Sequence, residues 1–224
     1  FDSTQVLETR LETRLFGELA RHAPSREQEP VDLQAQSVAD FLDAVAEATP
    51  IPAGGTVAAL VGALAASLGI MGARLSRQRG VEHRLSEISR RLRELMQADG
   101  DAYQRFLQAA RLAKTDRTRP AVLSSALHLA TEIPLEIAER ATEAGALLHA
   151  CSAEVKPRVR SDLSVGLVLA IAAADAGRHT VAENIKIQRN QRLKSSLLDR
   201  IRQMTIRLEE LRGLCYTAPL SQGQ

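Results

Sequence analysis

A glycine-containing turn that opens into a helix of small residues is the part of this sequence best suited to bind a ligand. The turn runs from Pro52 through Ala53, Gly54 and Gly55 to Thr56, and a long uncharged segment follows it. We predict that Thr56 is the N-cap of the helix, because its hydroxyl can accept a hydrogen bond from the first turn. Glycines allow close approach to the backbone, and the free N–H groups of a helix N-terminus attract anions. The turn is therefore expected to bind an anionic or polar group.

Carboxylates that could transfer protons occur in two places. Asp99 and Asp101 lie in one predicted helix, where a separation of two residues points their side chains about 160° apart, so only one of them can face a site. Asp162 begins another predicted helix, where a first-turn carboxylate stabilises the helix end by about 0.3–1 kcal/mol. A positioned carboxyl group can act as a general acid or base. Taken alone, however, both patterns are typical of solvated helix surfaces.

Basic and amide side chains provide groups that could hold a negatively charged ligand. Lys156, Arg158 and Arg160 lie directly before Asp162. An arginine guanidinium matches a carboxylate in bidentate fashion. Asn184, later in the chain, can both donate and accept hydrogen bonds.

The elements that must position these residues are all predicted to be helices. Leucine and alanine dominate, aromatic residues make up 3% and tryptophan is absent, which is typical of helices packed closely through small side chains. Hydrophobic periodicity predicts helices over residues 38–48, 56–76, 82–112, 120–132, 135–153, 163–175 and 180–214. The sequence has no strand pattern and no internal repeat. We predict an all-α fold, a single helical-bundle domain with long amphipathic and small-residue helices.

Serine, proline and glycine residues set the predicted helix boundaries. Ser37 and Ser161 are expected to be N-caps. Pro134 is expected to interrupt one helix and Gly177 to end another, because proline and glycine are the weakest helix formers. Gly100, in the middle of a long helix, predicts a kink or a close contact.

The domain organisation follows from the same patterns. Residues 1–36 are predicted to form an N-terminal helix and a linker, residues 37–214 the main domain, and residues 215–224 a tail. The chain begins with phenylalanine, inside a segment with helical spacing of leucines.

Several blocks of the sequence resemble, in order, the cyclodeaminase/cyclohydrolase family of folate enzymes. The turn at 52–56 and the VAA that follows resemble the family's PGGGS-V-A-A signature. The other blocks are SVADFLDAV (37–45), ADGDAYQRFLQAARLAK (98–114), TEIPLEIAERA (131–141), RSDLSVG (160–166) and TVAENIKI (180–187). The second of these is similar to the family's D-x-x-A-[FY] motif, in which the aspartate falls on Asp99.

This resemblance implies a reaction and a set of site residues. The reaction is formimidoyltetrahydrofolate cyclodeaminase activity, an ammonia-lyase reaction of histidine degradation that closes 5-formiminotetrahydrofolate to 5,10-methenyltetrahydrofolate and releases ammonia. It implies Asp99 as the catalytic residue. The implied substrate-binding residues are Pro52, Gly54, Gly55, Thr56, Asp162, Asn184, Lys156, Arg158 and Arg160. The last three would bind the glutamate tail of the folate.

The resemblance also implies partners. The substrate is a tetrahydrofolate derivative that can be polyglutamylated, and no cofactor is expected to be tightly bound. A homodimer is expected, with the apolar segment 57–73 or 163–174 at its interface. The first residues resemble the end of a formiminotransferase domain, which implies that such a domain is fused to this chain or associated with it.

Two other functions fit the same motifs. Methenyltetrahydrofolate cyclohydrolase activity would open the methenyl ring with water. A non-catalytic member would bind folate or support oligomerisation, and departures from the family pattern favour this reading: Ala53 replaces a glycine, and the stretch between Arg74 and Asp99 is shorter than in typical members. Thr180 also replaces an asparagine of the family pattern.

Bulk properties exclude several other classes. A net charge of +2 from 29 basic and 27 acidic residues indicates no nucleic-acid or membrane partner. The uncharged segment 57–73 is shorter than the roughly 20 residues of a membrane span, so we predict a buried helix. The five histidines and two cysteines form no metal-ligand spacing, which predicts no metal site. With no secretory pattern at the start, the expected location is cytoplasmic.

Overall fold

The computed structural model describes residues 32–188 and 190–217. The predicted N-terminal helix, most of the linker and the last tail residues lie outside the described residues. The elements are α2 (Val38–Ala46), α3 (Gly54–Leu75), α4 (Arg79–Arg111), α5 (Arg119–Ser152), the 3-10 helix η1 (Pro157–Val159), α6 (Arg160–Lys186) and α7 (Gln191–Thr217). Every regular element of the described ranges is helical, which confirms the all-α prediction.

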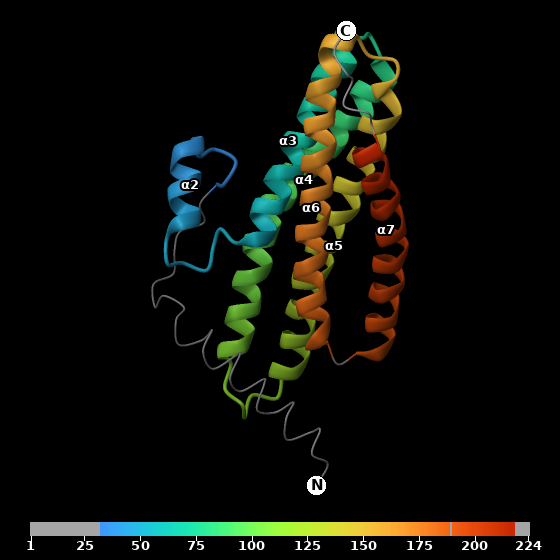
Figure 1. Cartoon of the computed structure of the whole chain (residues 1–224). Helices are drawn as coiled ribbons and strands as arrows, with labels where there is room; N and C mark the ends of the chain where they lie inside the picture. Colours follow the sequence, from blue (N-terminus) through green and yellow to red (C-terminus); the bar gives the residue numbers. More distant parts are fainter. Residues whose placement is uncertain (1–31, 189, 218–224) are drawn as a thin grey trace.

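Helices α3 to α6 form an antiparallel bundle, and α7 packs against α5 and α6 (Figure 1). The α3–α4 turn and the α5–α6 connection lie at the end that is uppermost in Figure 1, which we call the upper end. The α4–α5 and α6–α7 connections lie at the lower end. Helix α2 stands apart from the bundle beside α3.

Small residues allow α3 to occupy the centre of this bundle. Its alanines 59, 65, 66 and 73 are fully buried, and the leucines of α4 that pack around it are buried as well. Small side chains bring neighbouring helix backbones close together, so that each contact removes apolar surface from water. By length and composition α3 could also cross a membrane, but just over half of its apolar window is buried inside the bundle, as expected for a core helix.

Helix α5 continues through Pro134, so the predicted interruption is wrong. Proline lacks an N–H group, which leaves the carbonyl of Ala130 without its helical partner. The side-chain amide of Asn184 on α6 donates to that carbonyl at 2.7 Å. Helix α6 likewise continues through Gly177, where a Cβ atom would lie 2.7 Å from the carbonyl oxygen of Pro134. This glycine allows two helices to approach closely and does not end one.

Other predicted boundaries also require correction. The region 180–214 is two helices, because α6 ends at Lys186 and α7 begins at Gln191. Ser161 is not an N-cap, since η1 leads directly into α6 at Arg160. Ser37 is confirmed as the N-cap of α2, where its Oγ accepts a hydrogen bond from the backbone N–H of Asp40 at 3.1 Å.

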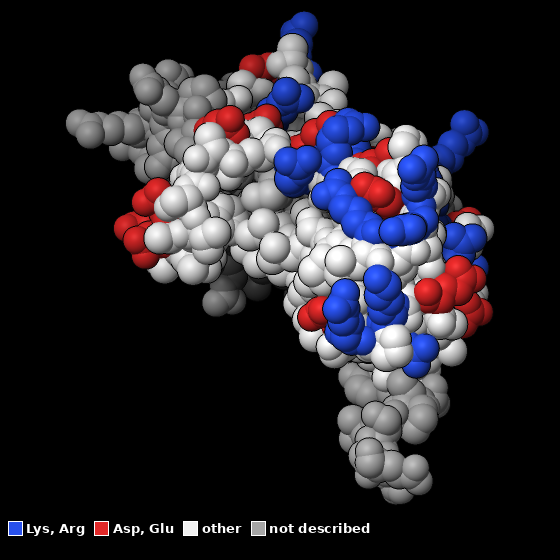
Figure 2. Space-filling model, turned by 90° about the horizontal axis from the view of Figure 1, so that it is seen from above, with Lys and Arg blue, Asp and Glu red and all other residues white. Residues whose placement is uncertain are grey.

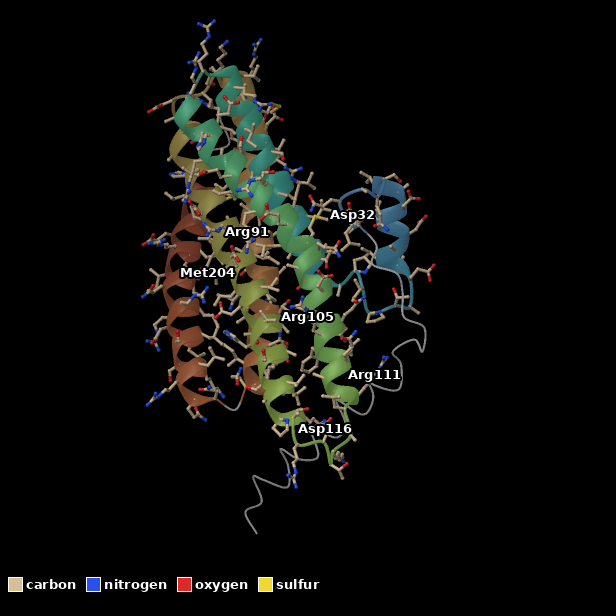
Figure 3. The ribbon with its side chains drawn as sticks, turned by 180° about the vertical axis from the view of Figure 1, so that it is seen from behind. Asp32, Arg91, Arg105, Arg111, Asp116 and Met204 are labelled. Atoms are coloured by element: carbon tan, nitrogen blue, oxygen red, sulfur yellow. The ribbon has the colours of Figure 1, made fainter. Side chains whose placement is uncertain are left out.

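Ion pairs on the outside of the bundle join neighbouring helices. Arg91 of α4 donates to both carboxylate oxygens of Glu136 on α5, at 2.8 and 2.7 Å. Arg91 is labelled in Figure 3, which views the molecule from behind. Arg200 of α7 bonds in the same bidentate way to Glu139 on α5 and also reaches Glu132. Planar guanidinium groups suit such pairing and fix the helix register.

Candidate functional site

The N-terminus of α3 and the middle of α4 meet at Asp99. The hydroxyl of Thr56 donates to Asp99 Oδ2 at 3.0 Å, and the backbone N–H of Thr56 also bonds to this carboxyl group. Thr56 is the fully buried third residue of α3 and not its N-cap, which corrects the sequence prediction. The N-cap is Ala53, whose side chain cannot accept a hydrogen bond. A carboxyl group from another helix therefore caps α3.

The two glycines of the turn have different surroundings. A Cβ atom on Gly55 would lie 2.2 Å from Asp99 Oδ1, so a side chain cannot be added there without moving the carboxyl group. Gly54 is exposed and has open space where its Cβ would be. Ala53 has φ −123°, an extended conformation that any residue adopts, so its replacement of a glycine causes no backbone strain. Pro52 is buried and anchors the turn.

The environment of Asp99 gives its carboxyl group a higher pKa than that of an ordinary aspartate. Burial raises the pKa of Asp99, and the hydrogen bonds from Thr56 only partly oppose this effect. Desolvation penalises the charged carboxylate, whereas hydrogen-bond donors favour it. Asp101, in contrast, is exposed and accepts a hydrogen bond from Gln97 at 3.1 Å. The prediction that only one of the two aspartates faces the bundle is confirmed.

Gly100 lies beside Asp99 and allows the turn before α3 to pack onto α4. A Cβ atom at this position would lie 3.1 Å from the side chain of Ile51. The predicted alternative of a close contact is therefore confirmed, and α4 runs unbroken through this position.

The lower half of α6 extends past the end of α3. Ala173 packs against Gly62, whose Cβ would lie 3.5 Å from the alanine Cβ. Thr180 and Asn184 follow on the same face of α6, about 10 and 16 Å further along the axis. Gly55 lies about 10 Å from Gly62 in the same direction. Thr180 is therefore level with Asp99, and Asn184 lies about one helical turn beyond it.

Asn184 has a structural role in addition to any contact with a ligand. Its amide nitrogen is bound to the carbonyl that Pro134 leaves free, as described above. This bond fixes which end of the amide points at α5, so the amide oxygen is left to accept a hydrogen bond from another partner. Pro134 therefore orients Asn184.

Tyr103 is a further candidate for the site, which the sequence analysis did not single out. It follows Asp99 by one turn on the same face of α4 and is half-buried. Burial raises the pKa of the Tyr103 phenol, so its hydroxyl stays protonated. The spacing of four residues from Asp99 was the signal that could have identified it.

Four of the predicted binding residues lie elsewhere. Lys156, Arg158 and Arg160 are exposed at the upper end, and Asp162 is in the first turn of α6. A Cβ on Gly72 of α3 would lie 2.7 Å from the neighbouring Leu163, which places this region level with Gly72. Figure 2, which views the upper end, shows lysine and arginine side chains gathered there.

The distance between these two regions is large within one chain. Gly72 is about 24 Å along α3 from Thr56. Thr56 and Asp99 therefore lie together, Asn184 lies about one helical turn from their level, and the basic residues lie at the other end of the bundle.

A groove of about 570 Å³ lies between α4 and α5, away from the N-terminus of α3. Its lining includes Arg105 and Gln108 of α4, and Arg105 is labelled in Figure 3. Most of the other lining residues are aliphatic, with no group for proton transfer. Within the described ranges, no cluster of three or more histidine, cysteine, aspartate or glutamate residues could hold a metal ion.

The fold and site together define an all-α bundle protein in which a half-buried carboxyl group is held at a helix N-terminus. The sequence profile of the formiminotransferase-cyclodeaminase family matches residues 37–203. Because this match covers more than half of the chain, the protein belongs to the formiminotransferase-cyclodeaminase family.

A solved structure shares the fold. The formiminotetrahydrofolate cyclodeaminase of Thermotoga maritima superposes with a TM-score of 0.74 at 22% sequence identity, covering 82% of this chain and 95% of that one. No curated protein sequence matches this chain significantly.

Proposed function

We propose that this chain is a formimidoyltetrahydrofolate cyclodeaminase that closes 5-formiminotetrahydrofolate to 5,10-methenyltetrahydrofolate and releases ammonia. The observation that supports this most strongly is the half-buried carboxyl group of Asp99, bound by Thr56 at the N-terminus of α3. Membership of the family and the activity of the Thermotoga maritima protein agree with it.

The reaction needs proton transfer and no protein nucleophile. The folate N10 attacks the carbon of the formimino group, whose nitrogen is protonated, and the N10 proton must leave as the new C–N bond forms. The former imino nitrogen must then gain this proton so that the C–N bond to it breaks and ammonia departs. Asp99 can accept the proton from N10 and deliver it to the departing nitrogen, and the methenyl product keeps the positive charge. A positioned carboxyl group contributes about 10²–10⁴-fold to such a step.

The residues around Asp99 would bind and orient the substrate. The hydroxyl and the backbone N–H of Thr56 hold the carboxyl group in place, while Pro52 and Gly55 would shape the turn. The open face of Gly54 would allow the ligand to approach. The amide oxygen of Asn184 would accept a hydrogen bond from the pterin, and the Tyr103 hydroxyl is close enough along α4 to contact it.

We also propose that the substrate carries a glutamate tail, which Lys156, Arg158 and Arg160 would bind through its carboxylates. Asp162 would bind the substrate beside them. The active form would be a homodimer, fused to or associated with a formiminotransferase. The protein would act in the cytoplasm, where its two free cysteines stay reduced.

Parallel assays of the purified chain test this function. With 5-formiminotetrahydrofolate, we expect methenyltetrahydrofolate and ammonia to form in equal amounts, at a rate that the Asp99→Asn variant lowers by about 10²-fold or more. Hydrolysis of methenyltetrahydrofolate without ring closure of the formimino compound would identify a cyclohydrolase instead. Folate binding without either reaction would identify a non-catalytic member.

A further inference from the structure

The stretch of chain that contains α2 begins and ends at the same point on α4. Leu33, before α2, and Ile51, before α3, both lie against Gly100. A Cβ atom on this glycine would be 3.9 Å from Leu33 Cδ1 and 3.1 Å from Ile51 Cγ2. Residues 33–51, which we call the α2 segment, therefore form a loop whose two ends meet on α4 next to Asp99.

One side chain of α4 binds the first end of the α2 segment. The Oε1 atom of Gln97 accepts a hydrogen bond from the backbone N–H of Leu33 at 3.2 Å. The Nε2 atom of the same side chain donates to Asp101 Oδ1 at 3.1 Å. Because the amide donates only through nitrogen and accepts only through oxygen, Asp101 fixes which end of Gln97 faces Leu33. The exposed aspartate of the 99/101 pair therefore has a role of its own.

The second end of the α2 segment continues directly into the turn that binds Asp99. Ile51 precedes the buried Pro52, and the hydroxyl and backbone N–H of Thr56 at the end of this turn bond to the Asp99 carboxyl group. Between the two ends, Phe41 of α2 is buried in the core cluster that α3 and α4 form. Figure 1 shows the rest of α2 apart from the bundle, so the two ends and this one side chain hold the segment.

The ends of the α2 segment also exclude water from the α4 backbone beside Asp99. Gly100 is buried although it has no side chain, and Leu33 is only 6% exposed. Burial is the largest cause of the raised pKa of Asp99. Displacing the segment is therefore expected to lower this pKa, because water stabilises the charged carboxylate.

Charged neighbours do not produce that shift in the pKa of Asp99. Helix α3 has no ionisable side chain before Arg74, and the part of α6 at this level presents Thr180 and Asn184. Tyr103, one turn along α4, stays neutral because burial raises the pKa of its phenol. Among the described residues, burial and the hydrogen bonds of Thr56 are the causes of the shift.

We propose that Gln97 is a positioning residue for the reaction: oriented by Asp101, it holds the α2 segment against α4 and thereby keeps the turn before α3 and the Asp99 carboxyl group in place for proton transfer. Gln97 acts through Leu33 and the turn and does not contact the substrate. This inference rests on the proposed function, in which Asp99 accepts the N10 proton.

An exchange of donor and acceptor between two side chains tests this role. Gln97→Glu keeps an oxygen that can accept from Leu33, but it places a second carboxylate one turn from Asp101, where like charges repel. Adding Asp101→Asn to Gln97→Glu restores a donor on the opposite side chain, so the double variant is expected to behave like wild type. Asp101→Asn alone is the matched control, because its amide oxygen still accepts from Gln97. Asp101 is exposed and Gln97 is partly exposed, so each variant is expected to fold.

Hydrogen exchange of the Leu33 amide reports the bond to Gln97 whether or not the protein is an enzyme. We expect exchange to be at least about tenfold faster in Gln97→Glu than in wild type, because local opening exposes this amide to solvent. The double variant and the Asp101→Asn control should both show exchange close to that of wild type.

Turnover of 5-formiminotetrahydrofolate reports the effect on Asp99. At saturating substrate we expect Gln97→Glu to be about tenfold slower, which is part of the roughly 10²–10⁴-fold that a positioned carboxyl group contributes. The rate should fall on the acid side as Asp99 is protonated, and in Gln97→Glu this limb of the pH–rate profile should move to lower pH. The double variant should regain both the rate and the profile.

Each failure has a separate meaning. Unchanged exchange of the Leu33 amide in Gln97→Glu would overturn the role of Gln97 in holding the α2 segment. Faster exchange with wild-type turnover and pH profile, or slow turnover that the double variant does not restore, would overturn its role in positioning Asp99. A wild-type protein with the expected exchange but no turnover would overturn the proposed function itself.

Discussion

Replacing Gly55 with alanine tests whether the position of the Asp99 carboxyl group matters for activity. The added Cβ would lie 2.2, 2.6 and 2.7 Å from Asp99 Oδ1, Cγ and Oδ2. These distances are too short for any real contact, so the carboxyl group must rotate away. It then loses the hydrogen bonds from the hydroxyl and the backbone N–H of Thr56, while both backbones remain in place.

The effect on stability can be worked out from opposing contributions. Loss of the cap costs about 1 kcal/mol, and leaving the buried Thr56 hydroxyl without an acceptor costs about 1–3 kcal/mol. Alanine in place of glycine returns about 0.5–1 kcal/mol. We therefore expect the free energy of unfolding to fall by about 1–3 kcal/mol, which leaves the protein folded, whereas turnover falls by about 10²–10⁴-fold.

The assay combines urea unfolding with the rate of methenyltetrahydrofolate formation. Gly80→Ala is the control, because Gly80 also lies in the first turn of a helix but its Cβ would meet open space. This control should unfold at the same or slightly higher urea concentration and keep wild-type turnover. A folded Gly55→Ala variant with wild-type turnover would refute the reasoning that the carboxyl group acts from its observed position.

Three further predictions concern single groups. Because the pKa of Asp99 is raised, the folded protein binds the proton of this carboxyl group more tightly than the unfolded chain does. Protonation of Asp99 therefore stabilises the fold below the ordinary aspartate pKa of 3.8, and this stabilisation is lost as pH rises through the pKa of the folded state. Asp99→Asn should remove this pH dependence from urea midpoints, and an unchanged dependence would show that another group causes it. Asn184→Ala leaves the Ala130 carbonyl unpaired and should lower the free energy of unfolding by about 1–3 kcal/mol. The loss should be smaller in a Pro134→Ala background, where residue 134 regains its N–H, and equal losses in the double-mutant cycle would contradict this account. Arg158→Ala should weaken binding of a triglutamate folate more than a monoglutamate folate, with the difference shrinking as salt rises, and equal titration curves for the two ligands would assign the arginine to solvent.

The sequence predicted the helices well because their apolar residues repeat with helical period. It did not predict the joins between them, because the same residue types have different effects in different packing. A proline usually ends a helix, but at Pro134 the side-chain amide of Asn184 on α6 binds the backbone carbonyl that the proline leaves without a partner. A glycine often ends a helix as well, but Gly177 allows α6 to pass close to the Pro134 carbonyl. Both effects depend on tertiary contacts that a local pattern does not contain.

The site was predictable only in part for the same reason. The motifs indicated Asp99 and Thr56, but the assignment of Thr56 as an N-cap missed that a carboxyl group from α4 caps the helix. The basic residues near Arg160 were grouped with them because short motifs carry no distances along the bundle. The antiparallel course of α3 and α6 places these residues at the other end of the molecule.

The most direct test of the central claim is a single-turnover measurement with excess enzyme and 5-formiminotetrahydrofolate, comparing wild type with Asp99→Asn. Our account predicts that wild type converts the bound substrate to methenyltetrahydrofolate with one ammonia released per site. It predicts that Asp99→Asn binds the same substrate but converts it at least about 10²-fold more slowly. Equal single-turnover rates for the two proteins would contradict proton transfer by Asp99.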